Sequence, residues 1–164
     1  DFFLLHIDEK WFEGFYYNDY NKINLNTDNF KNLIQSIKKK FKKNIVITSG
    51  STSIENFDQI INNSFVKSKY KNIYTSKLHT KKLLFLSNLD FRDLEILVKK
   101  SSFVFCCEGA ISHISHNLNK KTFALVNKNH LRTAKFWTSH MPKIYLINRE
   151  NISKIIKYIN KIKL

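Results

Sequence analysis

The sequence has few of the residues that interrupt secondary structure or cross-link chains: 164 residues include three glycines, one proline and two cysteines. Cys106 and Cys107 are adjacent, which excludes the Cys-x-x-Cys spacing of metal and redox sites and a disulfide framework. No apolar run approaches the ~20 residues that a membrane-spanning helix needs, and no signal-peptide pattern is present. Walker, Gly-x-Ser-x-Gly and Asp-x-Asp motifs are also absent. We therefore expect a cytoplasmic protein with reduced thiols, no metal and no other cofactor.

Arginine is also scarce, since the formal charge of +15 comes almost entirely from lysine and the arginines stand only at positions 92, 132 and 149. Arginine is the residue expected at bidentate contacts with bases and phosphates, and the lysines are spread from one end of the sequence to the other. We therefore expect no nucleic-acid partner. The basic charge still suits a phosphorylated ligand or a peripheral contact with an anionic membrane surface.

Short apolar runs alternate with segments of helical periodicity, which predicts an α/β fold: a right-handed, mostly parallel sheet with helices on both faces. The sequence is 43% hydrophobic, enough for one core, so we expect a single domain over residues 1–164. Strands are expected at 2–7, 44–48, 82–87, 103–107, 122–126 and 144–147, with a short one near 73–74. Helices are expected to begin at Thr27 or Asp28, at Thr52, at Asp90, near Ala110 and at Ile152, with a long loop over 127–141. Because Asp1 opens directly into a strand-like run, we also expect the chain to be part of a longer protein.

The segment Phe103–Leu118 organises the rest of the sequence. It begins as a short buried strand, passes through Glu108-Gly109-Ala110, and continues with the apolar spacing of a short helix. In an α/β sheet, such a strand-to-helix junction offers free backbone N–H groups and the positive end of the helix dipole to a phosphate. The junction is therefore our first candidate for an anion-binding site, although most such junctions bind nothing.

Other candidate residues lie in loops that a parallel sheet brings to the same edge. Lys10 is a candidate phosphate ligand, with a plain surface lysine as the alternative. Glu55 can accept a hydrogen bond from a ribose hydroxyl, or close a capping box with Thr52. Glu108 can accept from a sugar hydroxyl, or simply stabilise the helix start. His113 faces either the ligand or the core; paired with His116 it would still lack a third metal ligand.

Together these residues resemble the C-terminal domain of the ADP-heptose:lipopolysaccharide heptosyltransferases, glycosyltransferase family 9. Glu108-Gly109-Ala110-Ile111-Ser112-His113 resembles the family's Asp-Ser/Thr-Gly-x-x-His signature, or its Glu-Gly-Gly-x-x-His form. His6–Trp11 resembles the loop whose lysine, next to a tryptophan, reaches the donor phosphates. Ile47–Gly50 with Glu55 resembles the following strand, glycine turn and acidic residue, and Thr133–His140 resembles a late loop that closes on the donor.

The resemblance implies a Rossmann-like half of a two-domain GT-B enzyme that binds a nucleotide-diphosphate sugar, heptose-like, for inverting and metal-independent transfer. It implies that Lys10 and the helix start at Ala110–Ser112 hold the departing diphosphate, with a hydrogen bond from His113. The implied acceptor is a cell-envelope glycan or lipopolysaccharide core. The resemblance also implies that the catalytic base belongs to an N-terminal domain outside this chain, and that the protein works in the cytoplasm at the surface of the inner membrane.

The match departs from the family's pattern in three places: Glu108 replaces the commoner Asp, Lys10 and Trp11 are adjacent where many relatives have one residue between them, and the pair after Glu108 differs. Gly109-Ala110 replaces the family's Ser/Thr-Gly pair, so the hydroxyl that helps hold the diphosphate is missing. A non-catalytic nucleotide- or anion-binding module is therefore the second interpretation. A basic nucleic-acid binder is the third, and the scattered lysines argue against it.

Overall fold

A computed structural model describes residues 1–12, 23, 25–50, 54–77 and 83–162. The described residues form an eight-stranded sheet with the strand order β3-β4-β5-β2-β1-β6-β7-β8. The strands are β1 (Phe2–Ile7), β2 (Asn44–Ser49), β3 (Phe65–Lys67), β4 (Ile73–Ser76), β5 (Leu83–Leu86), β6 (Phe103–Cys107), β7 (Lys121–Val126) and β8 (Ile144–Asn148). The strands from β5 to β8 in this order are all parallel, whereas β3 and β4 extend the sheet as an antiparallel pair.

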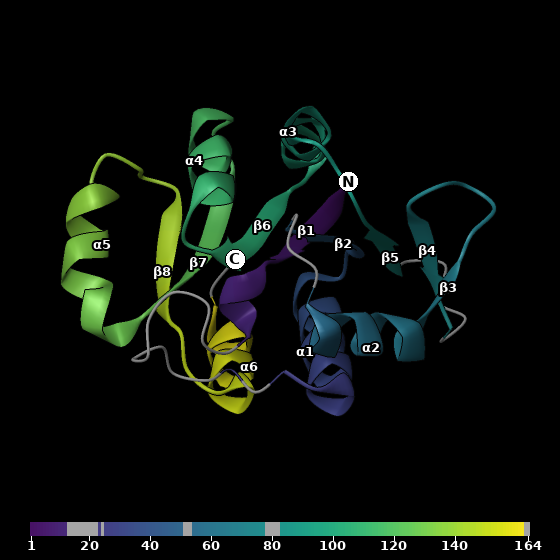
Figure 1. Cartoon of the computed structure of the whole chain (residues 1–164). Helices are drawn as coiled ribbons and strands as arrows, with labels where there is room; N and C mark the ends of the chain where they lie inside the picture. Colours follow the sequence, from purple (N-terminus) through teal and green to yellow (C-terminus); the bar gives the residue numbers. More distant parts are fainter. Residues whose placement is uncertain (13–22, 24, 51–53, 78–82, 163–164) are drawn as a thin grey trace.

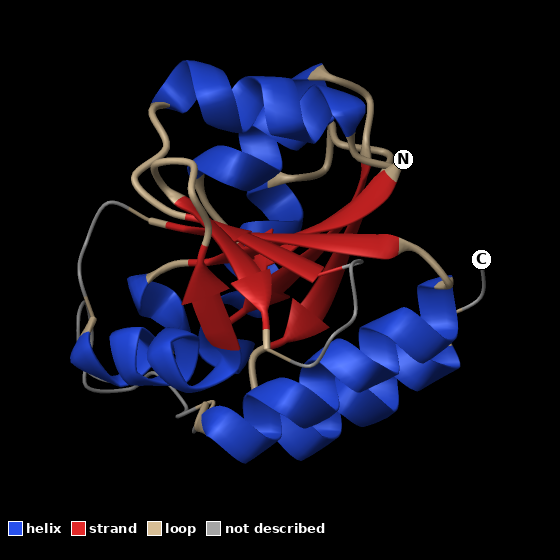
Figure 2. Ribbon diagram, turned by 90° about the vertical axis from the view of Figure 1, so that its right-hand side faces the viewer, coloured by secondary structure: helices blue, strands red, loops and turns tan. Residues whose placement is uncertain are grey.

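Helices cover both faces of the sheet (Figures 1 and 2). They are α1 (Thr27–Phe41), α2 (Glu55–Ser64), α3 (Phe91–Lys100), α4 (Ala110–Asn117), α5 (Leu131–Trp137) and α6 (Ile152–Lys161), with short 3₁₀ helices η1 (Glu9–Trp11) and η2 (Lys128–His130). α1, α2 and α6 pack on one face, α3 and α4 pack on the other, and α5 lies beside β8 at the end of the sheet. The parallel strands follow the order of a Rossmann-like fold, with β1 at the centre. From β1 the chain adds β2 and β5 on one side of the sheet and then crosses to add β6, β7 and β8 on the other side. The predicted α/β fold is confirmed.

Alternation along β1 assigns its side chains to two separate cores. Phe3 and Leu5 point into the larger core, which α1, α2 and α6 close, while Leu4 points into the smaller core under α3 and α4. The larger core is rich in aromatic rings: Phe3 lies 4.6 Å from Phe41 and 6.5 Å from Phe105 between ring centroids. Because the central strands are buried on both faces, they read in the sequence as continuous apolar runs.

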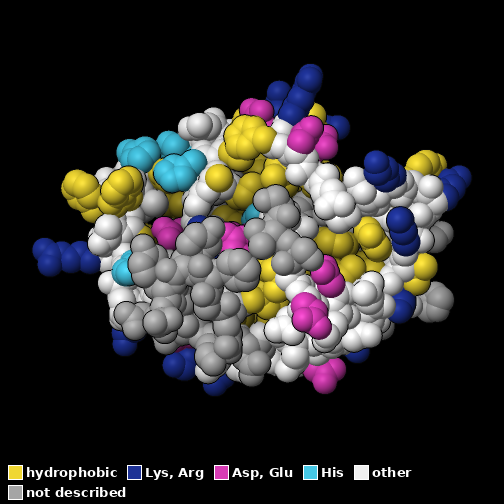
Figure 3. All heavy atoms as spheres, in the orientation of Figure 1, with side chains coloured by type: hydrophobic (Ala, Val, Ile, Leu, Met, Phe, Trp, Pro, Cys, Tyr) yellow, Lys and Arg dark blue, Asp and Glu magenta, His cyan; other side chains and the backbone are white. Residues whose placement is uncertain are grey.

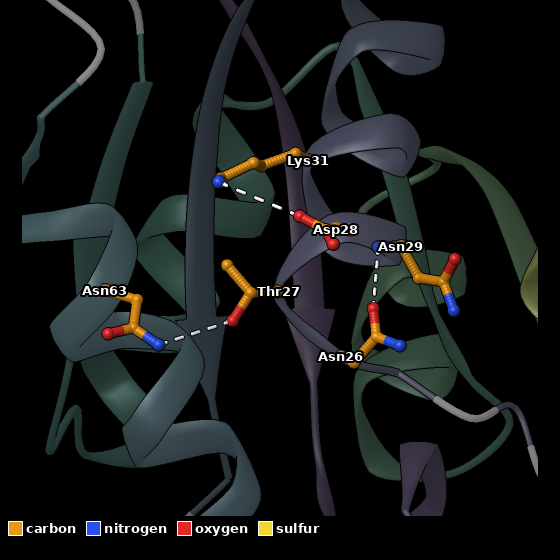
Figure 4. Close-up of polar contacts among 6 residues, drawn as sticks. All are labelled: Asn26, Thr27, Asp28, Asn29, Lys31 and Asn63. Atoms are coloured by element: carbon orange, nitrogen blue, oxygen red, sulfur yellow. Dashed lines mark hydrogen bonds and ion pairs between the residues drawn. The ribbon is translucent and has the colours of Figure 1, made fainter.

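The start of α1 corrects one detail of the sequence reading (Figure 4). The N-cap is Asn26, one residue before the expected Thr27 or Asp28, and its side-chain oxygen accepts a hydrogen bond from the Asn29 N–H at 2.9 Å. Thr27 instead accepts a hydrogen bond from the Asn63 side chain of α2 at 3.4 Å. Asp28 forms an ion pair with Lys31 at 3.9 Å, on the helix surface. The expected capping role of Thr52 lies outside the described residues.

Two segments and one helix face differ from the sequence reading. The segment 127–141, expected as a loop, contains η2 and α5, and the strand β3 has no counterpart among the expected strands. The apolar residues of α3 pack unequally: Val98 is buried, Leu94 and Leu97 are partly buried against the smaller core, and Phe91 is 63% exposed. In each case tertiary packing, not local periodicity, decides the outcome, because these elements bury few side chains of their own.

Candidate functional site

The candidate site lies where β1 and β6 end side by side. Residue pairs from Phe3–Phe103 to Leu5–Phe105 align the two strands in parallel, so their carboxyl ends open at the same edge of the sheet. Beyond that edge the chain turns into η1 after β1 and into α4 after β6. A ligand crevice is expected outside this point in an open α/β sheet, because the connections leave in opposite directions there. The loops carrying Lys10 and Glu108 are therefore brought together, as predicted from parallel topology.

Lys10 reaches across this junction and lies directly over the start of α4. Its ammonium Nζ donates a hydrogen bond to the backbone carbonyl of Glu108 at 2.6 Å. A Cβ atom placed on Gly109 would lie 2.8 Å from the same nitrogen. Gly109 also has φ +150° and ψ −155°, a backbone conformation that is essentially restricted to glycine. Gly109 is thus required for its backbone conformation, and a side chain there would displace the Lys10 ammonium from its present position.

The first turn of α4 is fixed by Ser112. This hydroxyl is buried; it donates to the Gly109 carbonyl at 2.6 Å and accepts from the Gly109 N–H at 3.1 Å. Ala110 and Ile111 begin the helix, so their N–H groups have no carbonyl one turn earlier to bond. These two N–H groups and the helix dipole provide the electropositive backbone that an anion needs.

The loop that presents Lys10 is held in place by several hydrogen bonds. The Asp8 carboxylate accepts from the Lys10 N–H at 3.1 Å, and the guanidinium of buried Arg149 donates to the Lys10 carbonyl. Trp11 is fully buried, and its indole N–H donates to the His6 carbonyl at 3.1 Å. The Trp11 ring packs against Phe105 of β6 at 5.8 Å between centroids. The lysine is therefore directed by a rigid turn, while its ammonium remains at the rim.

A pocket of about 410 Å³ opens beside Lys10. One wall is formed by the β6–α4 junction and the other by α5 and its flanking residues; the lining residues are Lys10, Glu108, Gly109, Ser112, His113, His130, Thr133, Ala134, Trp137 and Thr138. His113 is exposed on this wall, and Trp137 is 66% exposed opposite it. Figure 3 looks onto this face, where histidine side chains gather over α4 and α5. Of the predicted site residues, the structure brings Lys10, Glu108, Gly109, Ser112 and His113 into one pocket. Ala110 is exposed and is not among the residues that line it.

Sequence reasoning singled out no individual residue of the second wall. Thr133, Ala134, Trp137 and Thr138 come from the segment Thr133–His140, which was expected as a late loop that closes on the donor, and η2 supplies His130. Trp137 was the one residue that could have indicated this wall. A tryptophan in a segment without apolar periodicity is not expected to be buried in the core, so it is a candidate for ligand contact. Most of these residues lie on or next to α5. The sequence did not predict this helix, because its single buried residue, Ala134, gives no apolar periodicity.

Glu55 lies apart from this pocket. It is exposed in the first turn of α2 and is not among the residues that line the pocket beside Lys10. A neighbouring pocket of about 370 Å³ opens at the ends of β2 and β5, and its lining includes Gly50 and the carboxylate residue Asp58, one helical turn beyond Glu55. A ribose-binding role for Glu55 therefore stays a prediction that the pocket geometry does not support directly.

The histidines form a pair that the sequence did not indicate. The rings of His116 and His140 lie 5.2 Å apart between centroids and nearly perpendicular, which joins α4 to the segment after α5. Within the described ranges, no three His, Cys, Asp or Glu side chains come together as a metal ion would require. Nor does any described helix combine the length and hydropathy needed to span a membrane.

The titratable groups whose pKa is displaced lie at the ends of β1 and β6. Burial, followed by repulsion from the Lys10 charge, lowers the pKa of His6 to about 4. Burial raises the pKa of Asp8 to about 6, although the Lys10 charge works against this. Burial also raises the pKa values of the Cys106 and Cys107 thiols, so both are un-ionised at neutral pH. Displaced pKa values are found where titratable groups are buried in low-dielectric surroundings, and they are frequent at functional sites.

Comparison with known proteins identifies the fold and no family. No protein-family model matches the chain, and no curated protein matches its sequence. Among solved structures, the chain is similar to the Methanocaldococcus jannaschii UDP-GlcNAc 2-epimerase, determined in complex with UDP-GlcNAc and UDP. The TM-score is 0.57 at 14% identity, over 99% of this chain and 39% of that one. The fold is thus a Rossmann-like half-domain of the GT-B kind. Membership of the heptosyltransferase family stays a prediction.

Proposed function

We propose that the pocket beside Lys10 binds the diphosphate of a nucleotide-diphosphate sugar, and that this chain is the donor-binding half of a glycosyltransferase. The observation that carries the proposal is the lysine ammonium held over a glycine at the start of α4, at the β1–β6 junction. The similar epimerase was solved with a nucleotide sugar and a nucleoside diphosphate, which supports this class of ligand. The predicted phosphate role of Lys10 and Gly109 agrees with this arrangement.

The diphosphate would replace an existing contact. Lys10 donates to the Glu108 carbonyl, a neutral acceptor, at 2.6 Å. A phosphate oxygen is a stronger, charged acceptor, so the ammonium would turn to it by rotating its side chain. The N–H groups of Ala110 and Ile111 would donate to the same phosphate from the helix side. Two independent sources of positive potential would then converge on one anion.

The remaining pocket walls suit the organic parts of such a ligand. Trp137 offers an exposed aromatic face and His113 a ring nitrogen, while Glu108 offers a carboxylate to a sugar hydroxyl. A base or a sugar ring can stack on an aromatic face, and a carboxylate discriminates hydroxyl patterns through hydrogen bonds. For the sugar we propose a heptose, as in the heptosyltransferase family that the sequence resembles.

The proposed reaction breaks the bond between the anomeric carbon and the diphosphate. An acceptor hydroxyl attacks that carbon from the opposite face, the diphosphate leaves with the bonding electron pair, and a base takes the hydroxyl proton. Lys10 and the α4 start would stabilise the charge that grows on the leaving group, so no metal is needed for this step. We assign the base, and the binding of a glycan or lipopolysaccharide acceptor, to a second domain on the cytoplasmic side.

Calorimetric titration tests the proposal with UDP, ADP, GDP and inorganic pyrophosphate as separate probes. At least one nucleoside diphosphate is expected to bind more tightly than pyrophosphate. Lys10→Met keeps the bulk of the side chain and removes its charge. A hydrogen bond to a charged group is worth about 1.5–3 kcal/mol, so we expect the dissociation constant to rise by about tenfold to a hundredfold.

Lys128→Gln is the matched control, because Lys128 is an exposed cation at the same edge that does not line the pocket. This variant should bind like the unchanged protein. Equal binding of pyrophosphate and every nucleoside diphosphate would contradict a nucleotide-sugar site. Equal losses in the two variants would show a diffuse charge effect instead of a built site.

A non-catalytic nucleotide-binding module is the second candidate. It is favoured by the one hydroxyl near the helix start, Ser112, which is already bonded to Gly109 on both its donor and acceptor sides. No side-chain hydroxyl among the described residues of this turn is therefore left for the diphosphate. If the protein including any adjoining domain binds sugar nucleotides but neither transfers nor hydrolyses them, this candidate replaces the transferase.

A further inference from the structure

The structure gathers lysines at the edge of the sheet opposite the pocket, where the parallel strands begin. We call this the basic edge and the opposite one the pocket edge. The basic edge carries Lys38, Lys39, Lys40, Lys42, Lys43, Lys99, Lys100, Lys120, Lys121, Lys143, Lys157 and Lys161. In the described parts of the chain, Asp1 is its single acidic residue, and it pairs with Lys43. Lysines that are scattered in the sequence are therefore concentrated in space.

The fold explains how this concentration arises. In a parallel α/β fold every crossover helix runs antiparallel to the strands, so the C-terminal ends of α1, α3 and α6 all point to the basic edge. Lysine stabilises helix C-termini, where the dipole is negative. Hydrogen bonds show that the helix ends adjoin neighbouring elements: Lys40 donates to the Asn160 carbonyl of α6 at 3.0 Å, and Lys120 to the Ser101 carbonyl after α3 at 2.9 Å.

Acidic residues and arginines follow the opposite distribution. Apart from Asp1, every described acidic residue belongs to the strand ends or to the N-terminal half of a helix, hence to the pocket edge. Figure 3 shows acidic side chains on the pocket face, several of them near its middle, and Lys and Arg side chains mostly at its outline. Arg92, Arg132 and Arg149 also lie towards the pocket edge, at or before the starts of α3, α5 and α6. The cationic side chains of the basic edge are thus all lysines, and Asp1 is its one acidic residue among the described residues.

An apolar pocket of about 350 Å³ lies within the basic edge. It opens between the starts of β7 and β8 and the end of α6, and is lined by Lys121, Phe123, Tyr145, Tyr158, Lys161 and Ile162. Tyr145 and Tyr158 are each 43% exposed, and the Lys121 ammonium lies 5.2 Å from the centre of the Tyr145 ring. Half-exposed tyrosines among lysines are typical of surfaces that meet the interfacial region of a bilayer.

We infer that the basic edge is a docking surface for a bilayer containing anionic lipids. Ammonium groups act as point charges, which suits a fluid layer of phosphate headgroups that imposes no fixed geometry. The tyrosine-lined pocket adds an apolar contact that a headgroup region can fill. A nucleic acid is disfavoured, because bidentate readout of bases and phosphates relies on arginine, and each arginine lies towards the other edge.

Docking in this way would leave the pocket open to the aqueous side. The six residues of β1 separate the two edges by about 20 Å, since a strand rises about 3.3 Å per residue. Both described ends of the chain lie on the docking side, to the right in Figure 2. The surface shares no residue with the pocket beside Lys10. The inference therefore stands or fails separately from the proposed nucleotide site.

Vesicle co-sedimentation tests the docking surface. The probes are vesicles of phosphatidylcholine alone and vesicles containing phosphatidylglycerol, each at low and high salt. The unchanged protein should bind only the anionic vesicles, and salt should release it. The variant combines Lys99→Gln, Lys100→Gln, Lys157→Gln and Lys161→Gln, all exposed side chains. Because each lysine near an anionic surface contributes about 1 kcal/mol, we expect its partition coefficient to fall by at least about tenfold.

The matched control removes the same charge elsewhere, by Lys67→Gln, Lys69→Gln, Lys71→Gln and Lys128→Gln, around the β3–β4 turn and η2. It should keep most of the vesicle binding. Equal losses in the two variants, or equal binding to neutral and anionic vesicles, would overturn the inference. It would also be overturned if the protein bound oligonucleotides, in a way that the basic-edge variant abolished, but no vesicles.

Discussion

The two edges of the sheet use charge in different ways. At the pocket edge, Lys10 is held by the Asp8 cap, the buried Trp11 and Arg149, and its ammonium meets one backbone carbonyl. At the basic edge, exposed lysines such as Lys99 and Lys157 project without a fixed acidic partner among the described residues. Binding at the pocket edge would depend on the exact position of the Lys10 ammonium, so a single substitution there should weaken it strongly. Binding at the basic edge would depend on the summed charge of many lysines, so each single substitution should weaken it only slightly.

The largest expected effect contrasts the two tryptophans of the pocket edge. Trp11 is fully buried under the Lys10 loop, whereas Trp137 is 66% exposed on α5. Trp11→Ala should lower the free energy of unfolding by about 3–5 kcal/mol, because it empties a packed site. Trp137→Ala should change it by less than about 0.5 kcal/mol, since no buried contact is lost. Urea unfolding of both variants measures this; similar losses would place Trp137 in the core.

The next effect separates the two turns that contain glycine. Gly109→Ala should cost about 1–3 kcal/mol, because alanine must adopt φ +150°. It should also weaken nucleotide binding, because the new Cβ would lie 2.8 Å from the present position of the Lys10 ammonium and would displace it. Gly50→Ala is the control, since its Cβ would lie no closer than 3.4 Å to any neighbouring atom. Thermal unfolding and calorimetry are the measurements.

A double variant distinguishes the two causes at Gly109. Lys10→Ala combined with Gly109→Ala removes the close contact and leaves the backbone conformation strained. If backbone strain determines the loss of stability, the double variant should be about as unstable as Gly109→Ala alone. Full recovery of stability would show that the lysine contact was responsible instead.

A pH effect of intermediate size is expected at Asp8. Burial raises the pKa of this carboxyl to about 6, so the folded protein holds the proton more tightly than the unfolded chain. The stability that this provides is complete below about pH 4 and is lost as the pH rises through 6. Asp8→Asn should therefore raise the free energy of unfolding by about 1–3 kcal/mol at pH 7 and change it little at pH 4.

Unfolding in urea at both pH values measures this difference. His6 affects both proteins alike: burial lowers its pKa to about 4, so its contribution is lost as the pH falls from about 6.5 through 4. Asp93→Asn, at an exposed position of α3, is the control variant. Equal gains at pH 4 and pH 7 would contradict a buried, protonatable Asp8.

The smallest effect is expected at the basic edge. Lys99→Gln and Lys157→Gln should each change the free energy of unfolding by less than about 0.5 kcal/mol, because exposed charges contribute little individually. Urea unfolding at low and high salt is the measurement. A loss above 1 kcal/mol for either variant would mean that these lysines are structural, which would end the contrast between the edges.

The central strands could be predicted because their sequences carry the whole signal. β1, β2, β6 and β7 are continuous runs of apolar and β-branched residues, since both faces of these strands are buried. Peripheral elements give weaker signals: Phe65 is the single buried residue of β3, and Ala134 that of α5. Such elements depend on neighbours that no local window contains.

The candidate site could be predicted in outline for a similar reason. Parallel topology alone places the loops after β1 and β6 at the same edge, although Lys10 and Glu108 are 98 residues apart in sequence. The close contact itself depends on the Asp8 cap and on the buried indole, which set the direction of Lys10. The wall formed by α5 could not be derived, because its orientation is decided by packing beside β8.

Positions 10 and 109 share one small volume at the start of α4. The ammonium of Lys10 occupies the volume that any side chain at 109 would claim. A lineage that exchanged Gly109 for another amino acid would strain the backbone there and would displace the Lys10 ammonium from the start of α4. Among descendants of this protein, a glycine at 109 should therefore be inherited together with a long basic residue at 10, and both should disappear together where anion capture has been abandoned.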